Sequence, residues 1–304
     1  PSRPRPPRPD APGRAPSARA VTRLVLNADD AGLAPGLARR IASLLASGRL
    51  GGTSLLACGE AFGEAVRALG EAGIADAGVH LCLVGGETPL SPPERVRGIA
   101  PGGRFPRSWP SVAARVASGL APVAEVEREW EAQVAAVLST GLRVTHLDAH
   151  QHLHLLPRLA PVAVALARRF GVPFVRAPRG DDPAATAYPG LAGSARARLL
   201  ALFGANARRL LARAGLPEPP RVLGLAEAGR MDLARWRTLL DALPSDGTFE
   251  VVLHPGVEDA RARERYPWGY SWEEEAAALE DDGLSGMMSA RGVARVGFAE
   301  LSRA

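Results

Sequence analysis

The chain contains few cysteines, and their spacing argues against two kinds of site. Among its 304 residues only Cys58 and Cys82 are cysteines, and no CxxC pair occurs. The sequence therefore predicts neither a disulfide framework nor a thiolate zinc site, and a reducing cytoplasm is the expected location. Both cysteines lie in apolar runs, so we expect buried free thiols. Cys82 stands two residues from His80 and is a minor candidate for contact with a metal ion.

Long apolar segments are also absent. No run of 18 or more apolar residues predicts a membrane span, and the first twenty residues lack the apolar segment of a signal peptide. Residues 1–20 are instead rich in proline and arginine, and five arginines against one aspartate give them a charge of +4. We expect this tail to be disordered, because its composition cannot form a buried core.

Little net charge remains in the rest of the chain. The whole sequence carries +5, so residues 21–304 carry only +1 once the +4 of the tail is subtracted. A nucleic-acid-binding fold needs a basic face on its folded part, which argues against a nucleic-acid partner. The hydrophobic content of 46% is sufficient for a substantial core.

Short apolar runs alternate with helical segments along residues 21–304. The expected strands are 21–27, 52–57, 77–84, 143–148, 172–178, 221–225, 249–255 and 292–298. The expected helices are 35–47, 61–72, 122–139, 157–169, 195–216, 231–242 and 272–282, and 85–121 is expected to be a long loop over a site. This alternation predicts a parallel sheet. Seven or eight such units favour a single α/β domain, an irregular TIM-like (β/α) barrel.

Histidine is concentrated in one stretch, THLDAHQHLHLLP (145–157), which holds four of the six histidines. Its even positions carry His146, Asp148, His150, His152 and His154. On a strand these side chains would share one face, whereas on a helix only His150 and His154 would. We expect a strand that ends near Asp148, with the later histidines in the loop that follows. Imidazoles beside a carboxylate predict a metal or catalytic site; the alternative is a polar loop or buried structural histidines.

Other unusual polar residues also lie at the carboxyl ends of expected strands. They are Asn27, Asp29, Asp30, His80, Arg176 and His254. Parallel α/β folds collect their active sites at this edge, so we predict that these residues and the histidine stretch form one site. Individual alternatives remain open: the two aspartates could cap the following helix, and Arg176 could form a surface ion pair.

Three motifs together resemble the YdjC-like family of carbohydrate deacetylases, which includes chitooligosaccharide deacetylases. They are LVLNADDAGLAPG (24–36), GVHLCL (78–83) and THLDAHQHLHLLP (145–157), with VVLHPG (251–256) as a weaker fourth. The resemblance runs in order through residues 22–303 and implies a barrel of the glycoside hydrolase/deacetylase type. Ala31 departs from the family pattern, which usually has an aromatic residue there.

The resemblance implies a metal-dependent hydrolase that removes the acetyl group from an N-acetylated amino sugar. One divalent metal ion would be held by Asp30, His80 and His150. Three protein ligands leave an open position, which suits zinc. Magnesium is the alternative, although two imidazoles favour a softer ion.

The resemblance also implies the catalytic groups. Asp29 would be the general base for the attacking water, and His254 would be the general acid for the departing amine. Arg176 would orient Asp29 through a bidentate contact. Groups that would face the substrate or support the ligands are Asp148, His152 and His146.

The substrate stays open between two branches of this family. Residues 221–255, with the pattern LGLAEAGRM, resemble a branch associated with hopanoid biosynthesis, in which a hopanoid-linked N-acetylglucosamine would be deacetylated. The histidine stretch resembles the generic family more closely. Residues 195–216 are apolar on one side and rich in arginine, so they could rest on the inner membrane and admit a lipid-linked substrate. An ordinary surface helix is the other interpretation, and a homodimer is compatible with the sequence.

Two other functional classes remain. One is a different barrel metallohydrolase, such as a phosphoesterase, which would normally show more carboxylates or a second metal cluster. The other is a non-catalytic carbohydrate-binding homologue, which would be expected to have lost one of the residues that make up the implied site.

Overall fold

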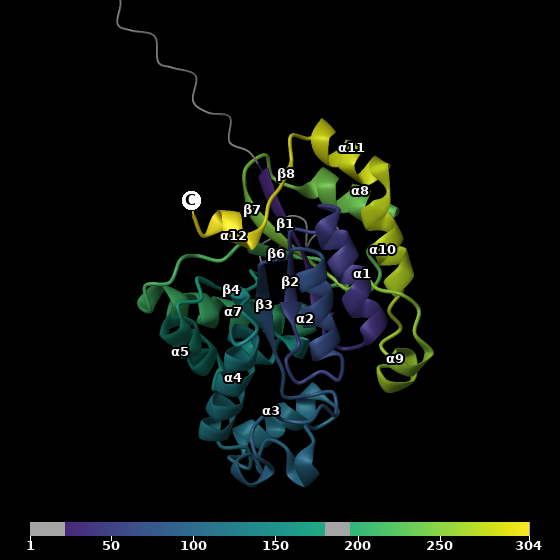
Figure 1. Ribbon diagram of the computed structural model, residues 1–304. Helices are drawn as coiled ribbons and strands as arrows, with labels where there is room; N and C mark the ends of the chain where they lie inside the picture. Colours follow the sequence, from purple (N-terminus) through teal and green to yellow (C-terminus); the bar gives the residue numbers. More distant parts are fainter. Residues whose placement is uncertain (1–21, 180–194, 304) are drawn as a thin grey trace, which may run out of the picture.

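The structure is a computed structural model that describes residues 22–179 and 195–303. The tail at 1–20, predicted to be disordered, lies outside the described residues. Strands occupy the middle of the molecule and helices surround them (Figure 1).

Within the described residues, eight strands form one parallel sheet, in the order β5-β4-β3-β2-β1-β7-β6, with β8 paired to β1. Their bounds are β1 Thr22–Ala31, β2 Gly52–Leu55, β3 Asp76–Leu81, β4 Arg143–Ala149, β5 Phe174–Val175, β6 Arg221–Leu223, β7 Gly247–Leu253 and β8 Ala294–Arg295. The sheet curls into a half-barrel, and among the described strands β5 and β6 are its two edges. All eight strands were predicted, and the irregular TIM-like barrel is confirmed.

Helices follow most of the strands and pack outside the sheet. They are α1 Pro35–Ala46, α2 Phe62–Glu71, α3 Trp109–Ala117, α4 Val123–Leu138, α5 Ala160–Phe170, α7 Ala195–Arg213, α8 Leu233–Ala242, α9 Ala260–Arg265, α10 Trp272–Glu280, α11 Asp282–Ala290 and α12 Phe298–Leu301. Short 3₁₀ turns are η1 Pro93–Arg95, η2 Pro101–Gly103 and η3 His150–Leu155. In the described parts of the chain, no helix combines the length and apolar character needed to cross a bilayer.

Local sequence explains where these helices begin and end. Pro35 occupies the first turn of α1, where its missing N–H costs no hydrogen bond. Asp232 caps α8 by accepting a bond from the Arg235 amide. Gly171 ends α5 in the left-handed conformation, at a φ of 67°. Helix α5 begins three residues later than predicted, with Pro161 in its first turn.

Strand β1 runs further than the sequence pattern predicts. The expected end is Asn27, whereas the strand reaches Ala31 and contains both Asp29 and Asp30. Its pairing with β2 shifts register beyond Ala28, and Asp30 has a left-handed φ of 63°. A bulge breaks the alternation of side chains, so both adjacent carboxylates can face the site. Neither caps α1, which has no side-chain cap, so that alternative is wrong.

Residues 85–121 are mostly irregular, as predicted, but they contain α3 and the short turns η1 and η2, which were not predicted. Buried Glu129 accepts backbone N–H bonds from Leu90 and Ser91, at 3.0 and 2.8 Å. Glu125 accepts two more from farther along the segment, at 2.7 and 3.1 Å. The many prolines and glycines of this segment masked the short helix α3 in the sequence pattern. The carboxylates of Glu125 and Glu129, both in α4, hold the segment in place.

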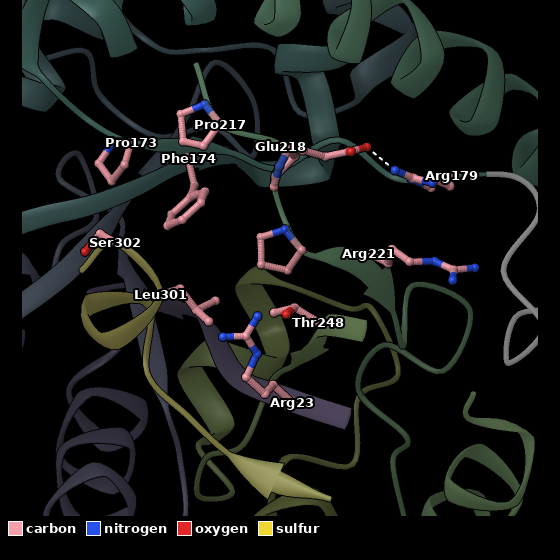
Figure 2. A pocket seen from close by; sticks show the side chains of 12 residues that line it. Arg23, Pro173, Phe174, Arg179, Pro217, Glu218, Arg221, Thr248, Leu301 and Ser302 are labelled. Atoms are coloured by element: carbon pink, nitrogen blue, oxygen red, sulfur yellow. Dashed lines mark hydrogen bonds and ion pairs between the residues drawn. The ribbon is translucent and has the colours of Figure 1, made fainter. Parts of the chain in front are cut away.

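A pocket of about 580 Å³ opens between the two edges of the sheet (Figure 2). Its lining includes Phe174, Arg221 and Thr248, which lie at the amino ends of β5, β6 and β7. No histidine lines it, and its position is opposite to the edge where parallel strands place catalytic groups. This pocket is therefore not the candidate active site.

Candidate active site

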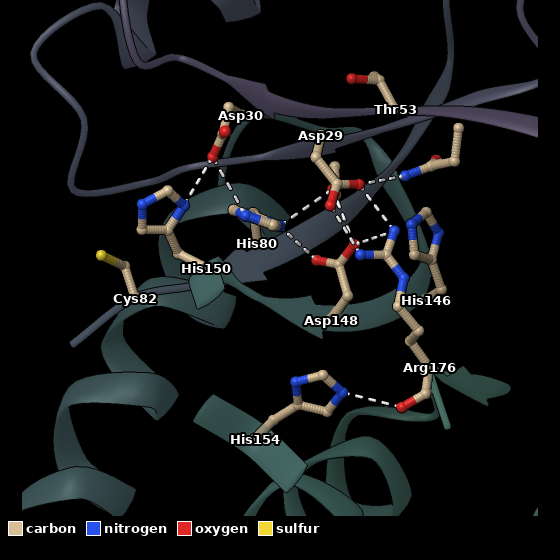
Figure 3. Close-up of polar contacts among 12 residues, drawn as sticks. Asp29, Asp30, Thr53, His80, Cys82, His146, Asp148, His150, His154 and Arg176 are labelled. Carbon is tan, nitrogen blue, oxygen red and sulfur yellow. Dashed lines mark hydrogen bonds and ion pairs between the residues drawn. The ribbon is translucent and has the colours of Figure 1, made fainter. Parts of the chain in front are cut away.

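The polar residues predicted from the sequence meet at the carboxyl edge of the half-barrel (Figure 3). Strand β1 supplies Asp29 and Asp30, and β3 supplies His80. Strand β4 supplies Asp148, and η3, which directly follows β4, supplies His150. The residues directly after β5 and β7 are Arg176 and His254. Each of these side chains is less than a tenth exposed. Groups from five strands therefore share one buried site.

Asp30, His80 and His150 bring three ligand atoms together. Oδ1 of Asp30 lies 3.1 Å from Nε2 of His80 and 2.8 Å from Nδ1 of His150. Nε2 of His150 is buried and has no hydrogen-bond partner among the described residues. A carboxylate with two imidazoles is a suitable donor set for a divalent metal ion, and more so for zinc than for magnesium.

The charge around Asp30 distinguishes this set from two neighbouring groups of possible ligands. Those groups, Asp29 with His80 and Asp148, and His146 with Asp148 and Glu250, use carboxylates that pair with Arg176. In the described part of the chain, the ion pairs of Asp30 are all with histidines. Its carboxylate is therefore the one left for a cation.

Burial and pairing act in opposite directions on the pKa values of this set. Burial alone would raise the pKa of Asp30, but the imidazoles of His150 and His80 hold that pKa well below its usual value. Burial would lower the pKa of His80, but Asp148 and Asp29 outweigh it and raise that pKa. Burial would likewise lower the pKa of His150, but that pKa is raised, chiefly by Asp30. These shifts favour an ionised Asp30 between two protonated imidazoles when no metal ion is bound.

Asp148 orients the ring of His80. Its Oδ1 lies 2.7 Å from Nδ1 of His80, so Nδ1 carries the proton and Nε2 turns toward Asp30. The other oxygen of Asp148 accepts from Ser54 at 3.0 Å and pairs with Arg176 at 2.7 Å. The carboxylate is 0% exposed, so its position is well defined. Ser54, in β2, was not identified from the sequence.

Arg176 holds Asp29 through two parallel bonds. Its terminal nitrogens donate to the two oxygens of Asp29, both at 2.7 Å, and Asn27 donates to the same carboxylate at 2.9 Å. The guanidinium also donates to Glu250, at 2.6 and 3.0 Å. Arg176 is 2% exposed, so its alternative role in a surface ion pair is wrong. Its signal in the sequence was its place after a strand.

Glu250 was missed in the sequence, although a lone carboxylate in the apolar run FEVVLHP was a usable signal. The side chain is 1% exposed and lies beside Arg176. Burial raises the pKa of Glu250 to about 7, against the attraction of Arg176. The acid is thus partly neutral near physiological pH, which lessens the repulsion among the three carboxylates that share one guanidinium.

His254 enters from β7 on the other side of Asp30. Its Nε2 lies 3.9 Å from Oδ2 of Asp30, and its ring packs on Tyr270 with centroids 4.8 Å apart. The backbone N–H of His254 donates to buried Glu275 at 2.5 Å. Nδ1 of His254 is buried without a partner among the described residues, so it is available to a ligand. Glu275 carried no sequence signal.

The remaining histidines lie around this centre. Strand β4 ends at Ala149, one residue beyond its predicted end, and η3 then breaks the alternation because Gln151 and His152 are left-handed. His146 lies deeper, stacked 3.9 Å from Phe298, and burial lowers its pKa to about 4. His154 donates from Nε2 to the carbonyl oxygen of Arg176 at 2.8 Å. It therefore helps to fix that arginine, whereas His152 is half-buried at the rim.

The two cysteines are buried and free, as predicted. Cys82 follows β3 close to His150 (Figure 3), and its sulfur donates to the carbonyl oxygen of Val84 at 3.1 Å. It is not part of the groups of converging ligand atoms found among the described residues. The structure therefore gives no support to a thiolate ligand.

Comparison with known proteins gives one family and several relatives. A family model described as YdjC-like protein matches residues 23–290. The carbohydrate deacetylase of Listeria monocytogenes serotype 4b (strain F2365) is 34% identical over 171 residues, which cover 56% of this chain and 66% of that protein. The carbohydrate deacetylase of Geobacillus stearothermophilus is 26% identical over 276 residues, which cover 91% of this chain and 96% of that one. The match to the Listeria protein thus spans just under two thirds of its length.

A solved structure has the same fold. It is the crystal structure of a candidate cellobiose-phosphate cleavage protein from Enterococcus faecalis V583, with a TM-score of 0.73 and 23% sequence identity. The alignment covers 93% of this chain and 99% of that one. At this level of identity the similarity bears on the fold alone.

Proposed function

Because the chain belongs to the YdjC-like protein family, we propose that it is a metal-dependent carbohydrate deacetylase that hydrolyses the acetamido group of an N-acetylated amino sugar. One observation carries the proposal: a buried Asp-His-His ligand set lies beside a carboxylate that an arginine grips at both oxygens. Relatives named carbohydrate deacetylase support the same reaction class.

The proposed metal ligands are Asp30, His80 and His150. A divalent ion bound there would polarise the amide carbonyl and lower the pKa of a water molecule, and the two imidazoles favour zinc over magnesium. The protein's own contribution is to hold the donors in place. Asp148 keeps Nε2 of His80 turned inward through the 2.7 Å contact at Nδ1.

Asp29 is the proposed general base. It would take a proton from the water that attacks the acetyl carbonyl, and Arg176 and Asn27 would fix the direction of its free lone pairs. His254 is the proposed general acid. Its ring would pass a proton to the nitrogen of the departing amine. The backbone N–H of His254 is held by Glu275, which fixes the position of the residue.

Acetate release from metal-loaded protein tests this proposal. We expect release from N-acetylglucosamine oligomers, and we expect it to vanish after chelation and in Asp29→Asn. The variant should still bind about one metal ion per chain, since Asp29 is not among the proposed ligands. No release from any acetylated sugar, with one metal ion bound per chain, would refute the deacetylase. Turnover of phosphate esters by the same protein would then favour the phosphoesterase alternative.

A second candidate substrate carries the acetylated sugar on an apolar group, as in a hopanoid conjugate. A small groove beside His152 is lined by Trp109 and Leu199, two apolar residues that are 40% and 38% exposed. We propose that this groove and α7 would receive such a group at a membrane surface, with the enzyme on the cytoplasmic side. Faster release from an N-acetylglucosaminyl lipid than from the free oligomers would support this choice, and equal or slower release would refute it.

A further inference from the structure

An irregular, turned segment between α9 and α10 places three aromatic rings along one side of the candidate site. Tyr266, Trp268 and Tyr270 occupy alternate positions, and the centroids of successive rings are 4.8 and 5.3 Å apart. The ring of Trp268 lies 5.1 Å from that of His150. The row therefore borders both a proposed metal ligand and, through the contact of Tyr270 with His254, the proposed proton donor.

The outer end of this aromatic row is anchored by a buried carboxylate. Glu87 is 2% exposed and accepts bonds from the hydroxyl of Tyr266 at 2.5 Å and from Arg265 at 2.8 Å. These contacts join the segment to the loop after β3, 178 and 179 positions away in the sequence. Tyr266 is thus a structural residue with its polar group satisfied.

The inner end is fitted against a glycine. A Cβ on Gly229 would lie 2.2 Å from the ring of Tyr270, and Gly229 has a left-handed φ of 74°. The backbone N–H of Met231, two residues later, donates to Glu275, the same carboxylate that anchors His254. The motif LGLAEAGRM (223–231), which contributes none of the proposed ligands or catalytic groups, therefore supports the aromatic row and the proposed acid together.

Trp268, in the middle of the aromatic row, is partly exposed to solvent and therefore accessible to a ligand. Trp268 and Tyr270 are half-buried, whereas Tyr266 is buried. Ligand sites combine an apolar, often aromatic wall with a few convergent polar groups, and here the wall adjoins His150 and His254 directly. A pyranose ring presents C–H groups on its faces, which suit an aromatic surface, and hydroxyl groups at its edge.

We propose that Trp268, flanked by Tyr270, is the platform on which the pyranose ring of the substrate stacks. This inference rests on the proposed function for the identity of the reaction, but the stacking itself requires only a pyranose ligand. The platform fixes the sugar laterally, so that its acetamido group extends toward Asp29 and the proposed metal ligands. Trp268 is then a specificity-determining residue that acts through binding.

Ligand binding and turnover of Trp268 variants test the platform. The probe is the N-acetylglucosamine trimer, titrated by calorimetry into metal-loaded Asp29→Asn protein, in which turnover is blocked. We expect Trp268→Leu to raise Kd about tenfold and Trp268→Phe to raise it less, because phenylalanine keeps part of the stacking surface. In the active enzyme, the same changes should raise KM and leave kcat within about twofold.

Phe170→Leu is the matched control, because Phe170 is a half-buried aromatic residue at the end of α5, near the opposite edge of the sheet. It should change neither Kd nor KM, and circular dichroism should show all variants folded. Sugar-induced quenching of tryptophan fluorescence should be lost in Trp268→Phe. Unchanged Kd in Trp268→Leu, or a loss of kcat alone, would overturn the platform.

The failure of this inference is distinguishable from failure of the proposed function. Acetate release with a Trp268-independent Kd would refute the platform and keep the deacetylase. Absence of acetate release, with trimer binding that weakens in Trp268→Leu, would refute the deacetylase and keep the platform. Absence of trimer binding to the folded, metal-loaded protein would refute the platform.

Discussion

Glu250 gives the most direct test of the buried charges beneath the candidate site. Its Oε1 accepts from Arg176, and the side chain is 1% exposed. Burial raises the pKa of Glu250 from 4.5 to about 7, because desolvation outweighs the attraction of Arg176. In the folded chain the acid is therefore mostly neutral at pH 5 and mostly ionised at pH 8. In the unfolded chain it is mostly ionised at both.

This difference makes stability depend on pH with a definite sign. The folded chain holds an extra proton between about pH 4.5 and 7, so the associated stabilisation is complete below pH 4.5 and is lost as the pH rises through 7. Its full size is about 3 kcal/mol. Glu250→Gln removes the titration and keeps an oxygen that can accept from Arg176. We expect its effect on the free energy of unfolding to be about 2–3 kcal/mol more favourable at pH 8 than at pH 5.

Urea unfolding of metal-free wild-type and variant protein at the two pH values measures this difference. Glu71→Gln is the control, because Glu71 lies at the surface with a side chain that is 73% exposed. Its effect on unfolding should be small and nearly the same at both pH values. An equal effect of Glu250→Gln at pH 5 and pH 8 would contradict the reasoning, since the buried acid would then not be the group that titrates.

Three further changes have defined outcomes. Gly229→Ala should lower the free energy of unfolding by about 2–4 kcal/mol, because it adds a clash with the ring of Tyr270 to a left-handed backbone. Gly215 is also left-handed but has open space around it, so Gly215→Ala should cost only about 1–2 kcal/mol in the same urea unfolding experiment. Equal losses in the two variants would exclude the clash. Arg176→Lys should lower kcat about a hundredfold in steady-state assays, because lysine cannot form the two parallel hydrogen bonds that orient Asp29. An unchanged kcat would refute the orienting role of Arg176. Asp148→Asn should weaken metal binding about 10- to 100-fold in calorimetric titration, because the ring of His80 loses its fixed orientation; unchanged affinity would contradict this.

The sequence predicted the elements whose signal is local. Strands and helices alternate with distinct periodicity, so all eight strands were found, and the histidines of β3 and β4 followed from their place at strand ends. The extension of β1 was not predicted, because the polar run NADD resembles a loop. Only the pairing with β2 and the left-handed Asp30 keep that run in the strand.

Other long-range partners of the site residues were not predicted, for a different reason. Arg176 and Glu250 are 74 positions apart, and Tyr266 and Glu87 are 179 apart. Such pairs depend on how the sheet curls and on which side chains face its interior, which a single sequence does not encode as a periodic pattern. The same limit applies to Trp268, whose proposed role follows only from the position of its ring beside that of His150.

The formal charges of the buried site connect its parts. With Glu250 neutral and the imidazoles neutral, three aspartates, Asp29, Asp30 and Asp148, face one guanidinium, which leaves two negative charges in a region almost without solvent. Uncompensated buried charge is costly, so the folded chain must neutralise it. Burial would lower the pKa values of His80 and His150, but neighbouring aspartates raise both, which favours protonated imidazoles in the metal-free chain. A divalent cation at the proposed ligands would also compensate these negative charges, so we expect metal binding to be accompanied by proton release.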